Sequence, residues 1–142
     1  MNAKPGQAPH QLDERTLVSG QIAPEQVAEL KRQGVTMIVN NRPDHEDPDQ
    51  PLGADIEAAA RDAGIEYRYV PIARGMGPSD IEAMRDAMRE CGDGKMLAFC
   101  RSGTRSTLAW AVARAEEGVP SEELDRCAAA AGFDLRPVHH LF

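Results

Sequence analysis

The sequence is poor in cysteine, and its few cysteines form neither a disulfide framework nor a zinc site. Only three of the 142 residues are cysteine, at positions 91, 100 and 127, and no two of them make a Cys-x-x-Cys pair. An odd number of widely spaced cysteines excludes the disulfide-rich secreted scaffolds and the zinc ribbons. A chain of this length can bury a sufficient core without cross-links. We therefore expect a reducing, cytoplasmic environment and no metal or other cofactor.

The sequence also lacks an excess of basic charge and any long apolar run. Sixteen lysines and arginines stand against 23 aspartates and glutamates, which gives a formal net charge of −7. This balance argues against a general nucleic-acid-binding protein and against binding to an anionic membrane surface. No apolar stretch reaches the length of a membrane-spanning helix, and the polar first residues do not resemble a secretory signal. We expect partners that are neither nucleic acid nor membrane.

The chain begins with a polar segment that we expect to be separate from the folded domain. Residues 1–13 are polar and include prolines at positions 5 and 9. Such a composition predicts a flexible tail. The remaining residues, 14–142, have the length of one ordinary domain.

Strand-like and helix-like segments alternate through this domain. Apolar, β-branched segments predict strands at 15–19, 35–39, 65–72 and 95–99. Apolar stripes with helical spacing predict helices at 24–33, 53–63, 79–91, 105–117 and 120–131, the third opened by a Ser79-x-x-Glu82 capping box. The alternation predicts an α/β fold with a mostly parallel central sheet flanked by helices.

The segment that connects strand 95–99 to helix 105–117 has the composition of a nucleophile site. It reads Cys100-Arg101-Ser102-Gly103-Thr104-Arg105-Ser106. The N–H groups of a tight loop, the positive end of the next helix and the Arg105 guanidinium all favour an anion there, including a reactive thiolate. We predict Cys100 and Arg105 as catalytic residues. The predicted substrate-binding residues around them are Arg101, Ser102, Gly103, which allows the bend, Thr104 and Ser106.

The order Cys-x-x-Gly-x-Arg-Ser after a strand resembles the active-site loop of rhodanese sulfurtransferases. It also resembles the Cys-x-x-Gly-x-x-Arg-Ser/Thr signature of protein tyrosine and dual-specificity phosphatases, shortened by one residue. Together with segments 18–21, 38–44 and 69–72, it is similar to the phosphatase-like domain of beta-lactamase-hydrolase-like proteins over about residues 15–131. The resemblance implies a dual-specificity-phosphatase-like fold. Some members of that family carry this domain fused to a persulfide dioxygenase and act in sulfide detoxification.

Two observations favour sulfur transfer over phosphate hydrolysis. The loop is one residue short of the phosphatase pattern, and a single sulfur atom needs a smaller ring of donors than the three oxygens of a phosphate. Phosphatases of this fold also carry a general-acid aspartate on the loop that corresponds to residues 73–77. That segment has no carboxylate here, Asp80 opens the next helix, and Phe99 stands where the phosphatases have a histidine.

We therefore expect a sulfurtransferase of the rhodanese type. It would move sulfane sulfur from thiosulfate or glutathione persulfide, through a Cys100 persulfide, to a thiol acceptor such as glutathione. The resemblance adds a persulfide dioxygenase as a partner in sulfide metabolism. A cysteine-dependent phosphatase with a phosphocysteine intermediate is the first alternative, and an inactive adaptor that binds anionic peptides is the second.

Several other polar residues give weaker indications. Arg42 and Arg74 follow strands that end at the same sheet edge as Cys100, so both are candidate substrate-binding residues. An Arg–Asp pair that stabilises the loop is an equal alternative for Arg42. We expect the acidic run 44–49 to be a solvated loop, and the adjacent His139 and His140 to bind no metal.

Three residues are expected to serve packing. Cys127 and Cys91 lie on apolar helix stripes and are assigned to the core, with a role as a second thiol open for Cys91. Trp110 is off the main stripe of its helix, so we expect it at an edge or an interface.

Overall fold

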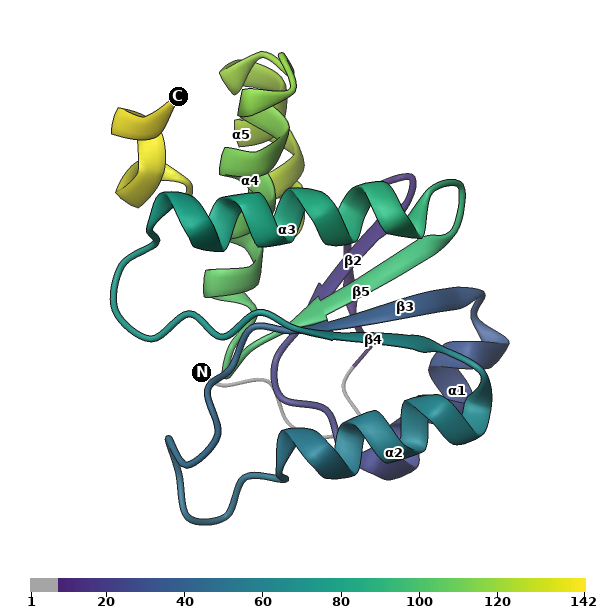
Figure 1. Cartoon of the computed structure of the whole chain (residues 1–142). Helices are drawn as coiled ribbons and strands as arrows, with labels where there is room; N and C mark the ends of the chain where they lie inside the picture. Colours follow the sequence, from purple (N-terminus) through teal and green to yellow (C-terminus); the bar gives the residue numbers. More distant parts are fainter. Residues whose placement is uncertain (1–7) are drawn as a thin grey trace.

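A five-stranded sheet forms the centre of the computed structural model, which describes residues 8–142 (Figure 1). In spatial order the strands are β1 (His10–Asp13), β2 (Thr16–Ser19), β5 (Lys95–Phe99), β3 (Val35–Asn40) and β4 (Glu66–Tyr69). Strands β2, β5, β3 and β4 pair in parallel, whereas β1 pairs with β2 in the antiparallel sense. The mostly parallel α/β sheet expected from the sequence is thereby confirmed.

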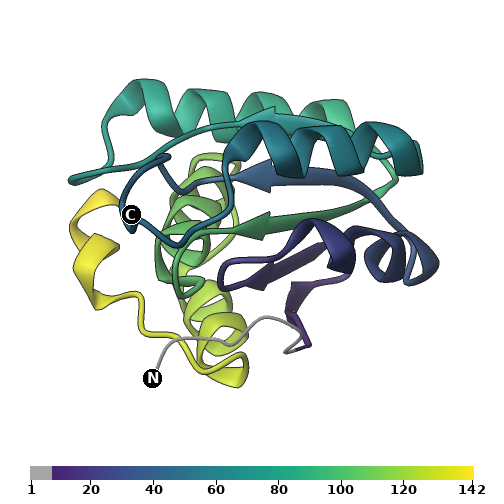
Figure 2. The same cartoon turned by 90° about the horizontal axis from the view of Figure 1, so that it is seen from below.

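Helices cover both faces of this sheet (Figures 1 and 2). One face is covered by a short 3-10 turn (Pro24–Gln26), α1 (Val27–Arg32) and α2 (Gly53–Ala63), and the other by α3 (Pro78–Cys91), α4 (Thr104–Glu116) and α5 (Ser121–Ala130). Each face has its own apolar core, because successive strand residues point to opposite sides. In β5, Leu97 and Phe99 belong to the core of the first face, and Met96 and Ala98 to that of the second.

Helix α4 is buried around most of its circumference because it lies between α3 and α5. Its residues from 109 to 113 are at most 3% exposed. Trp110, which we expected at an edge or an interface, is among them at 1%. Its indole N–H donates a hydrogen bond of 2.8 Å to the Asp13 carboxylate, which satisfies the one polar group of this large side chain.

The expected amino-terminal tail is too long by at least four residues. His10–Asp13 forms β1, in which His10 pairs with Val18, and the Leu12 side chain is buried at 4% exposure. A single apolar residue in a polar segment gives almost no periodic signal, so the strand could not be recognised from local pattern. Residues 1–7 of the predicted tail lie outside the described part of the chain.

Other boundaries differ by smaller amounts. Helix 53–63 and strand 95–99 are confirmed to the residue. Helix α3 begins one residue early, and the Asp80 carboxylate, rather than the predicted Ser79–Glu82 box, caps it by accepting the Gly77 N–H at 2.9 Å. The strand expected at 65–72 is shorter, and a 3-10 segment, Arg136–Leu141, was not expected. Among residues 8–142, no helix is long and apolar enough to cross a bilayer.

The burial of Leu12 gives a direct test of β1. Replacing Leu12 by Ala removes core packing, so we expect the free energy of unfolding to fall by about 2–5 kcal/mol. The matched control is Gln11→Ala on the exposed side of the same strand, for which a change within about 0.5 kcal/mol is expected. Urea unfolding followed by circular dichroism measures both. Equal, small effects of the two substitutions would show that this segment is a tail after all.

Candidate active site

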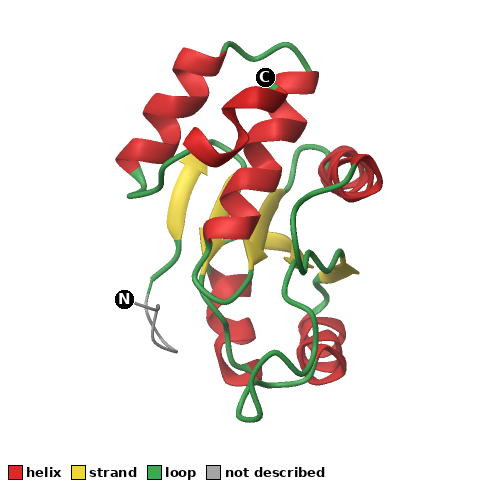
Figure 3. Ribbon diagram, turned by 90° about the vertical axis from the view of Figure 1, so that its left-hand side faces the viewer, coloured by secondary structure: helices red, strands yellow, loops and turns green. Residues whose placement is uncertain are grey.

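Cys100 directly follows the carboxyl end of the central strand β5, where a tight loop leads into α4. Figure 3 shows the strands, the helices and the loops that connect them. Its sulfur accepts a hydrogen bond from the Gly103 N–H at 3.1 Å. Gly103 is also the N-cap residue of α4, so the sulfur is next to the positive end of a 13-residue helix. Cys100 is 1% exposed. A main-chain donor therefore faces the sulfur, as the sequence predicts for a nucleophile held by its own loop.

Gly103 cannot be replaced by a larger residue without strain. Its φ is +91°, a left-handed conformation that side chains disfavour. A Cβ at this position would lie 3.0 Å from Cζ of Phe133 and 3.4 Å from the main-chain carbon of Ser19. Phe133, which follows α5, thus packs directly against the loop. The bend predicted at Gly103 is confirmed, and its close support by Phe133 is new.

Arg105 is held by a carboxylate from a distant loop. Its Nη1 donates to Glu46 Oε2 at 2.6 Å and to the main-chain oxygen of Ile72 at 2.7 Å, and its Nη2 donates to Glu46 Oε1 at 2.8 Å. A bidentate pair of this kind fixes the plane of the guanidinium. The hydrogen bonds that Arg105 donates to Glu46, and to a lesser degree the nearby charge of Cys100, raise the pKa of Arg105 above its usual value. Arg105 is therefore a permanent cation beside the sulfur.

Glu46 also binds a second arginine. Arg42 is buried at 4% exposure, and its Nε donates to Glu46 Oε1 at 3.0 Å while its Nη1 donates to Gln21 Oε1 at 3.0 Å. The hydrogen bond from Arg105 is the main cause that lowers the pKa of Glu46, and Arg42 adds to it. Arg42 therefore acts here as a buried anchor for Glu46. The loop pair considered for Arg42 exists, with Glu46 rather than an aspartate as the partner.

The remaining loop residues are more exposed or have other partners. Arg101 is exposed and lies 3.8 Å from the Asp47 carboxylate. The hydroxyls of Ser102 and Thr104 lie 3.2 Å from each other, so they can exchange a hydrogen bond at the loop surface. Both cationic residues of the loop, Arg101 and Arg105, thus face carboxylates of the acidic segment that we had expected to be merely solvated.

Two predicted substrate-binding residues are placed differently from the rest. Ser106 is fully buried, and its hydroxyl donates to Asn41 Oδ1 at 2.7 Å, while the Asn41 amide donates to the main-chain oxygen of Val70. The Ser106 hydroxyl thus donates to a side chain that follows β3, and this hydrogen bond connects α4 to the ends of β3 and β4. Arg74 is exposed and has no ion-pair partner within residues 8–142.

Four residues that support the site were not predicted from the sequence: Glu46, Asn41, Gln21 and Phe133. An acidic run that follows a strand at the same sheet edge as a basic loop was the signal that could have indicated Glu46. No local signal exists for Phe133, because its contact with the loop depends on how α5 packs.

The structure offers few groups that could act as a proton donor. The segment from Ala73 to Gly77 has no carboxylate, and Asp80 is engaged in capping α3. Glu46 is held in its ionised form by two arginines. Neither residues 73–77, nor Asp80, nor Glu46 therefore supplies a free carboxylic acid for a leaving group.

Metal-ligating side chains do not gather in the described part of the chain. Among residues 8–142, no group of three or more His, Cys, Asp or Glu side chains is arranged to hold a metal ion. His139 pairs with Asp125 at 2.8 Å. Cys91 and Cys127 are partly buried, and the Cys91 sulfur lies 3.6 Å from the Thr36 hydroxyl.

Comparison with known proteins shows which family this chain resembles in sequence. Residues 10–117 match the model of the phosphatase-like domain of beta-lactamase hydrolase-like proteins. A beta-lactamase hydrolase-like protein of Xylella fastidiosa (strain Temecula1) is 36% identical over 126 residues, which are 87% of this chain but 29% of that protein. The chain therefore spans less than a third of this relative.

Solved structures show the same fold over nearly the whole chain. A protein from Neisseria meningitidis Z2491, proposed to be a phosphatase, is 34% identical with a TM-score of 0.80, covering 93% of this chain and 94% of that one. Tk-PTP in its active form is 20% identical with a TM-score of 0.67, covering 89% and 88%. The latter identity supports a common fold only. The dual-specificity-phosphatase-like fold expected from the resemblance is confirmed.

The link between Glu46 and the two arginines predicts a pH-dependent contribution to stability. The pKa of Glu46 is lower in the folded state than in the unfolded state, where it is about 4.3. The ionised carboxylate therefore contributes its full stabilisation of the fold above about pH 4.3. This contribution is lost as the pH falls through the pKa of the folded state. We expect Glu46→Gln to lower the free energy of unfolding by about 1–2 kcal/mol at pH 7. Below about pH 4 the difference from wild type should shrink.

Urea unfolding across pH 3–7 measures this difference. Glu57→Gln, which breaks the exposed Glu57–Arg61 pair on α2, is the matched control and should cost under about 1 kcal/mol. If Glu46→Gln lowers the free energy of unfolding no more than the control does, or by an amount that does not change with pH, Glu46 does not anchor the two arginines.

Proposed function

The chain belongs to the phosphatase-like domain family of beta-lactamase hydrolase-like proteins, and on this premise we propose that it is a cysteine-dependent phosphatase with Cys100 as the nucleophile. The observation that carries the proposal is the Gly103 N–H directed at the Cys100 sulfur, at the start of α4. The Neisseria meningitidis protein compared above, which is 34% identical, is also described as a proposed phosphatase. This differs from the sulfurtransferase expected from the sequence, which we retain as a second candidate.

The proposed reaction has two steps. The Cys100 thiolate attacks phosphorus, a P–S bond forms, the P–O bond to the alcohol breaks, and the alcohol oxygen leaves with the electron pair. Water then attacks the phosphocysteine, the P–S bond breaks, and inorganic phosphate and the thiolate are released. The main-chain N–H groups of the loop and the Arg105 guanidinium stabilise the extra negative charge on the equatorial oxygens. Arg105 can do so in a fixed orientation, because Glu46 holds its plane.

The absence of a general-acid aspartate at residues 73–77, where the phosphatases carry theirs, suggests the class of substrate. Residues 73–77 contain no carboxylate, Asp80 caps a helix, and Glu46 is ionised. General acid catalysis contributes typically about 10²–10⁴ to a rate. A site without it acts best on phosphate esters whose leaving group is stable without a proton. We therefore propose aryl or acyl phosphates as substrates.

Sulfur transfer is the second candidate, and two observations favour it. Four residues separate Cys100 from Arg105, one fewer than in the phosphatase signature, and the missing acid is not needed when sulfite or a thiolate leaves. In this reaction the Cys100 thiolate attacks the outer sulfur of thiosulfate, a new S–S bond forms, and sulfite leaves with the electrons of the old one. A thiol such as glutathione then takes the outer sulfur from the persulfide. A persulfide dioxygenase would be a suitable enzyme to consume that product.

A single comparison separates the two candidates. Wild type and Cys100→Ser are assayed with an aryl phosphate, with thiosulfate plus cyanide or glutathione, and with glutathione persulfide. We expect the aryl phosphate to be hydrolysed, and Cys100→Ser to lose about 10³-fold or more of kcat. Arg105→Lys, which keeps the charge but loses the planar fork, should retain more activity than Arg105→Ala. Turnover of the sulfur donors alone would replace the first proposal by the second.

The third hypothesis, an inactive adaptor that binds anionic peptides, is tested in the same experiment. It requires that neither substrate class turns over and that iodoacetamide alkylates Cys100 slowly at neutral pH. Fast alkylation with turnover of either class excludes it.

The substrate class generates a separate prediction about Asp80. Wild type should hydrolyse an aryl phosphate about 10²-fold or more faster than an alkyl phosphate, because only the alkyl leaving group needs an acid. Asp80→Ala should leave this ratio unchanged and lower the free energy of unfolding by about 1 kcal/mol through loss of the α3 cap. Steady-state kinetics and urea unfolding measure the two effects. A selective loss of alkyl phosphate hydrolysis in this variant would identify Asp80 as a general acid and overturn our assignment.

A further inference from the structure

Arg42 lies beside the catalytic loop, although it follows a different strand. Asn41, which precedes it, donates its main-chain N–H to the main-chain oxygen of Phe99 at 2.8 Å, and Phe99 directly precedes Cys100. The main-chain N–H of Arg42 donates to Asn40 Oδ1 at 2.9 Å, which fixes the backbone from which the side chain extends. Residues 42 and 100 therefore leave the sheet at neighbouring points of its carboxyl edge.

Both side-chain partners of Arg42 contact the catalytic loop themselves. Arg42 Nη1 donates to Gln21 Oε1 at 3.0 Å, and the main-chain N–H of Gln21 donates to the main-chain oxygen of Arg101 at 3.3 Å. Arg42 Nε donates to Glu46 Oε1 at 3.0 Å, and Arg105 Nη2 donates to this same oxygen at 2.8 Å. The shared acceptor keeps these two nitrogens within about 6 Å of each other, a range in which one charge strongly affects the next.

The carboxylate that these two arginines share can balance only one of them. Within residues 8–142, Glu46 is the only carboxylate in ion-pair contact with either guanidinium. Arg42 is 4% exposed, so water screens its charge far less than it screens a surface arginine. The nearby pair of Arg101 and Asp47 is exposed and contributes one charge of each sign. One positive charge therefore remains at the site before Cys100 ionises.

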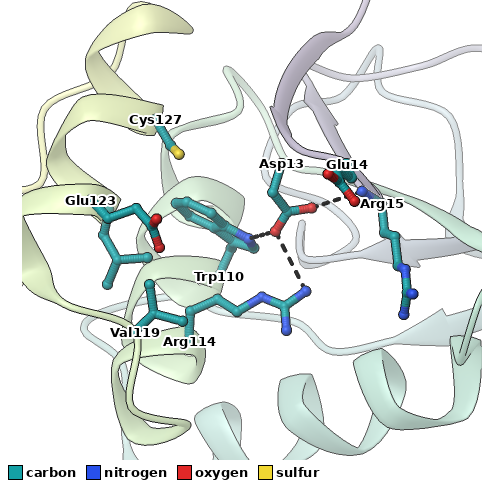
Figure 4. A pocket seen from close by; sticks show the side chains of 9 residues that line it. Asp13, Glu14, Arg15, Trp110, Arg114, Val119, Glu123 and Cys127 are labelled. Carbon is teal, nitrogen blue, oxygen red and sulfur yellow. Dashed lines mark hydrogen bonds and ion pairs between the residues drawn. The ribbon is translucent and has the colours of Figure 1, made fainter.

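The second half of α4 shows the reverse balance of charge (Figure 4). There Arg114 lies 3.4 Å from the Asp13 carboxylate and also donates to Glu117 at 2.9 Å, so one arginine faces two carboxylates. Two further carboxylates, those of Glu14 and Glu123, line the same pocket. In a chain with a net charge of −7, the excess of positive charge is therefore a local property of the catalytic end of this helix.

We propose that Arg42 is a specificity-determining residue, whose charge makes the site select a dianionic transferable group over a monoanionic one. With Cys100 as the thiolate, the charges of Arg42, Arg105, Glu46 and Cys100 sum to zero, and without Arg42 they sum to −1. A second negative charge on the substrate is therefore repelled less when Arg42 is present. The inference rests on the proposed function in that Cys100 is the nucleophile. It applies to either candidate reaction, because phosphate monoesters and thiosulfate are both dianions.

The first test compares two alkylating reagents of similar size that differ in charge. Iodoacetate is an anion and iodoacetamide is neutral, and both react with the Cys100 thiolate, so the ratio of their rates does not depend on how much of the thiol is ionised. Mass spectrometry of the Cys100 peptide separates this reaction from alkylation of Cys91 and Cys127. We expect Arg42→Gln to lower the ratio of the iodoacetate rate to the iodoacetamide rate by about three- to tenfold, the effect of one nearby charge in a partly solvated site.

Three further variants separate the charge of Arg42 from its contacts. Arg42→Lys keeps the charge but loses the planar fork, so its rate ratio should stay within about twofold of that of wild type. Glu46→Gln removes a negative charge from the same cluster and should raise the ratio, a change opposite in sign to that of Arg42→Gln. Arg61→Gln is the matched control, because Arg61 is also paired with a glutamate four positions away but is exposed, and it should leave the ratio unchanged.

The second test measures the preference of the wild-type site for dianions and needs no variant. Sulfate and methanesulfonate are both tetrahedral, but sulfate carries one more negative charge. Each anion is titrated at constant ionic strength, and the concentration that halves the rate of Cys100 alkylation by iodoacetamide gives its apparent Kd. We expect sulfate to bind at least about fivefold more tightly than methanesulfonate in wild type, and less than about twofold more tightly in Arg42→Gln.

Three results would overturn the proposal. If sulfate protects wild-type Cys100 no better than methanesulfonate does, the site does not select dianions, and this result stands even where an Arg42 variant fails to fold. If Arg42→Gln slows iodoacetate and iodoacetamide equally, the role of Arg42 is purely structural. If the ratio falls in Glu46→Gln, or falls as far in Arg61→Gln as in Arg42→Gln, the charge of this cluster does not decide the preference.

Failure of the proposed function is a separate outcome, because none of these measurements uses turnover. A protein that hydrolyses no aryl phosphate but shows the expected rate ratios and the preference for sulfate would lose the proposed reaction and keep the charge selection. A protein that hydrolyses the aryl phosphate but shows the same rate ratio in wild type and Arg42→Gln would keep the reaction and lose the role of Arg42.

Discussion

The hydrogen bond from the Gly103 N–H to the Cys100 sulfur is the contact on which the rest of the site depends. It requires the chain to reverse within three residues of the end of a strand and to begin a helix immediately. Gly103 meets both needs because it adopts a φ of +91° and serves as the N-cap of α4. The arrangement also needs a fixed strand and a fixed helix on either side of the bend. The central place of β5 and the near-complete burial of α4 supply them.

A second layer of contacts connects this loop to an oppositely charged one. Arg105 uses three of its five N–H donors on Glu46 and Ile72, which leaves two for an anion at the sulfur. The same packing that orients Arg105 also limits the access of a substrate to the Cys100 sulfur. Cys100 is 1% exposed, so side chains around the loop must move before a substrate reaches the sulfur. The Glu46 and Asp47 carboxylates already face Arg105 and Arg101. An anionic substrate therefore has to compete with them for these two cations.

The sequence was most informative where the structure depends on neighbours in the chain. The strand at 95–99, the bend at Gly103 and the placing of Cys100 before α4 follow from local pattern, and all three are found. Contacts between distant segments could not be inferred in this way. Glu46 reaches Arg105 across 59 positions. The strand His10–Asp13 exists because β2 offers it a free edge and the core accepts Leu12, and neither condition is visible in a polar segment. Ser106 looked like a site hydroxyl because its buried partner, Asn41, was unknown.

The contact of Phe133 with Gly103 bears on where this unit can be divided. The region that matches the family model ends at residue 117, yet Leu124, Leu135 and Val138 are buried in the same core as α4, and Phe133 packs against the bend at Gly103. A fragment cut at the end of the matched region would expose the side of α4 that α5 covers and would leave the bend without its aromatic support. In circular permutation, domain transplantation or fusion to another protein, the segment that has to be kept whole therefore extends at least to Val138.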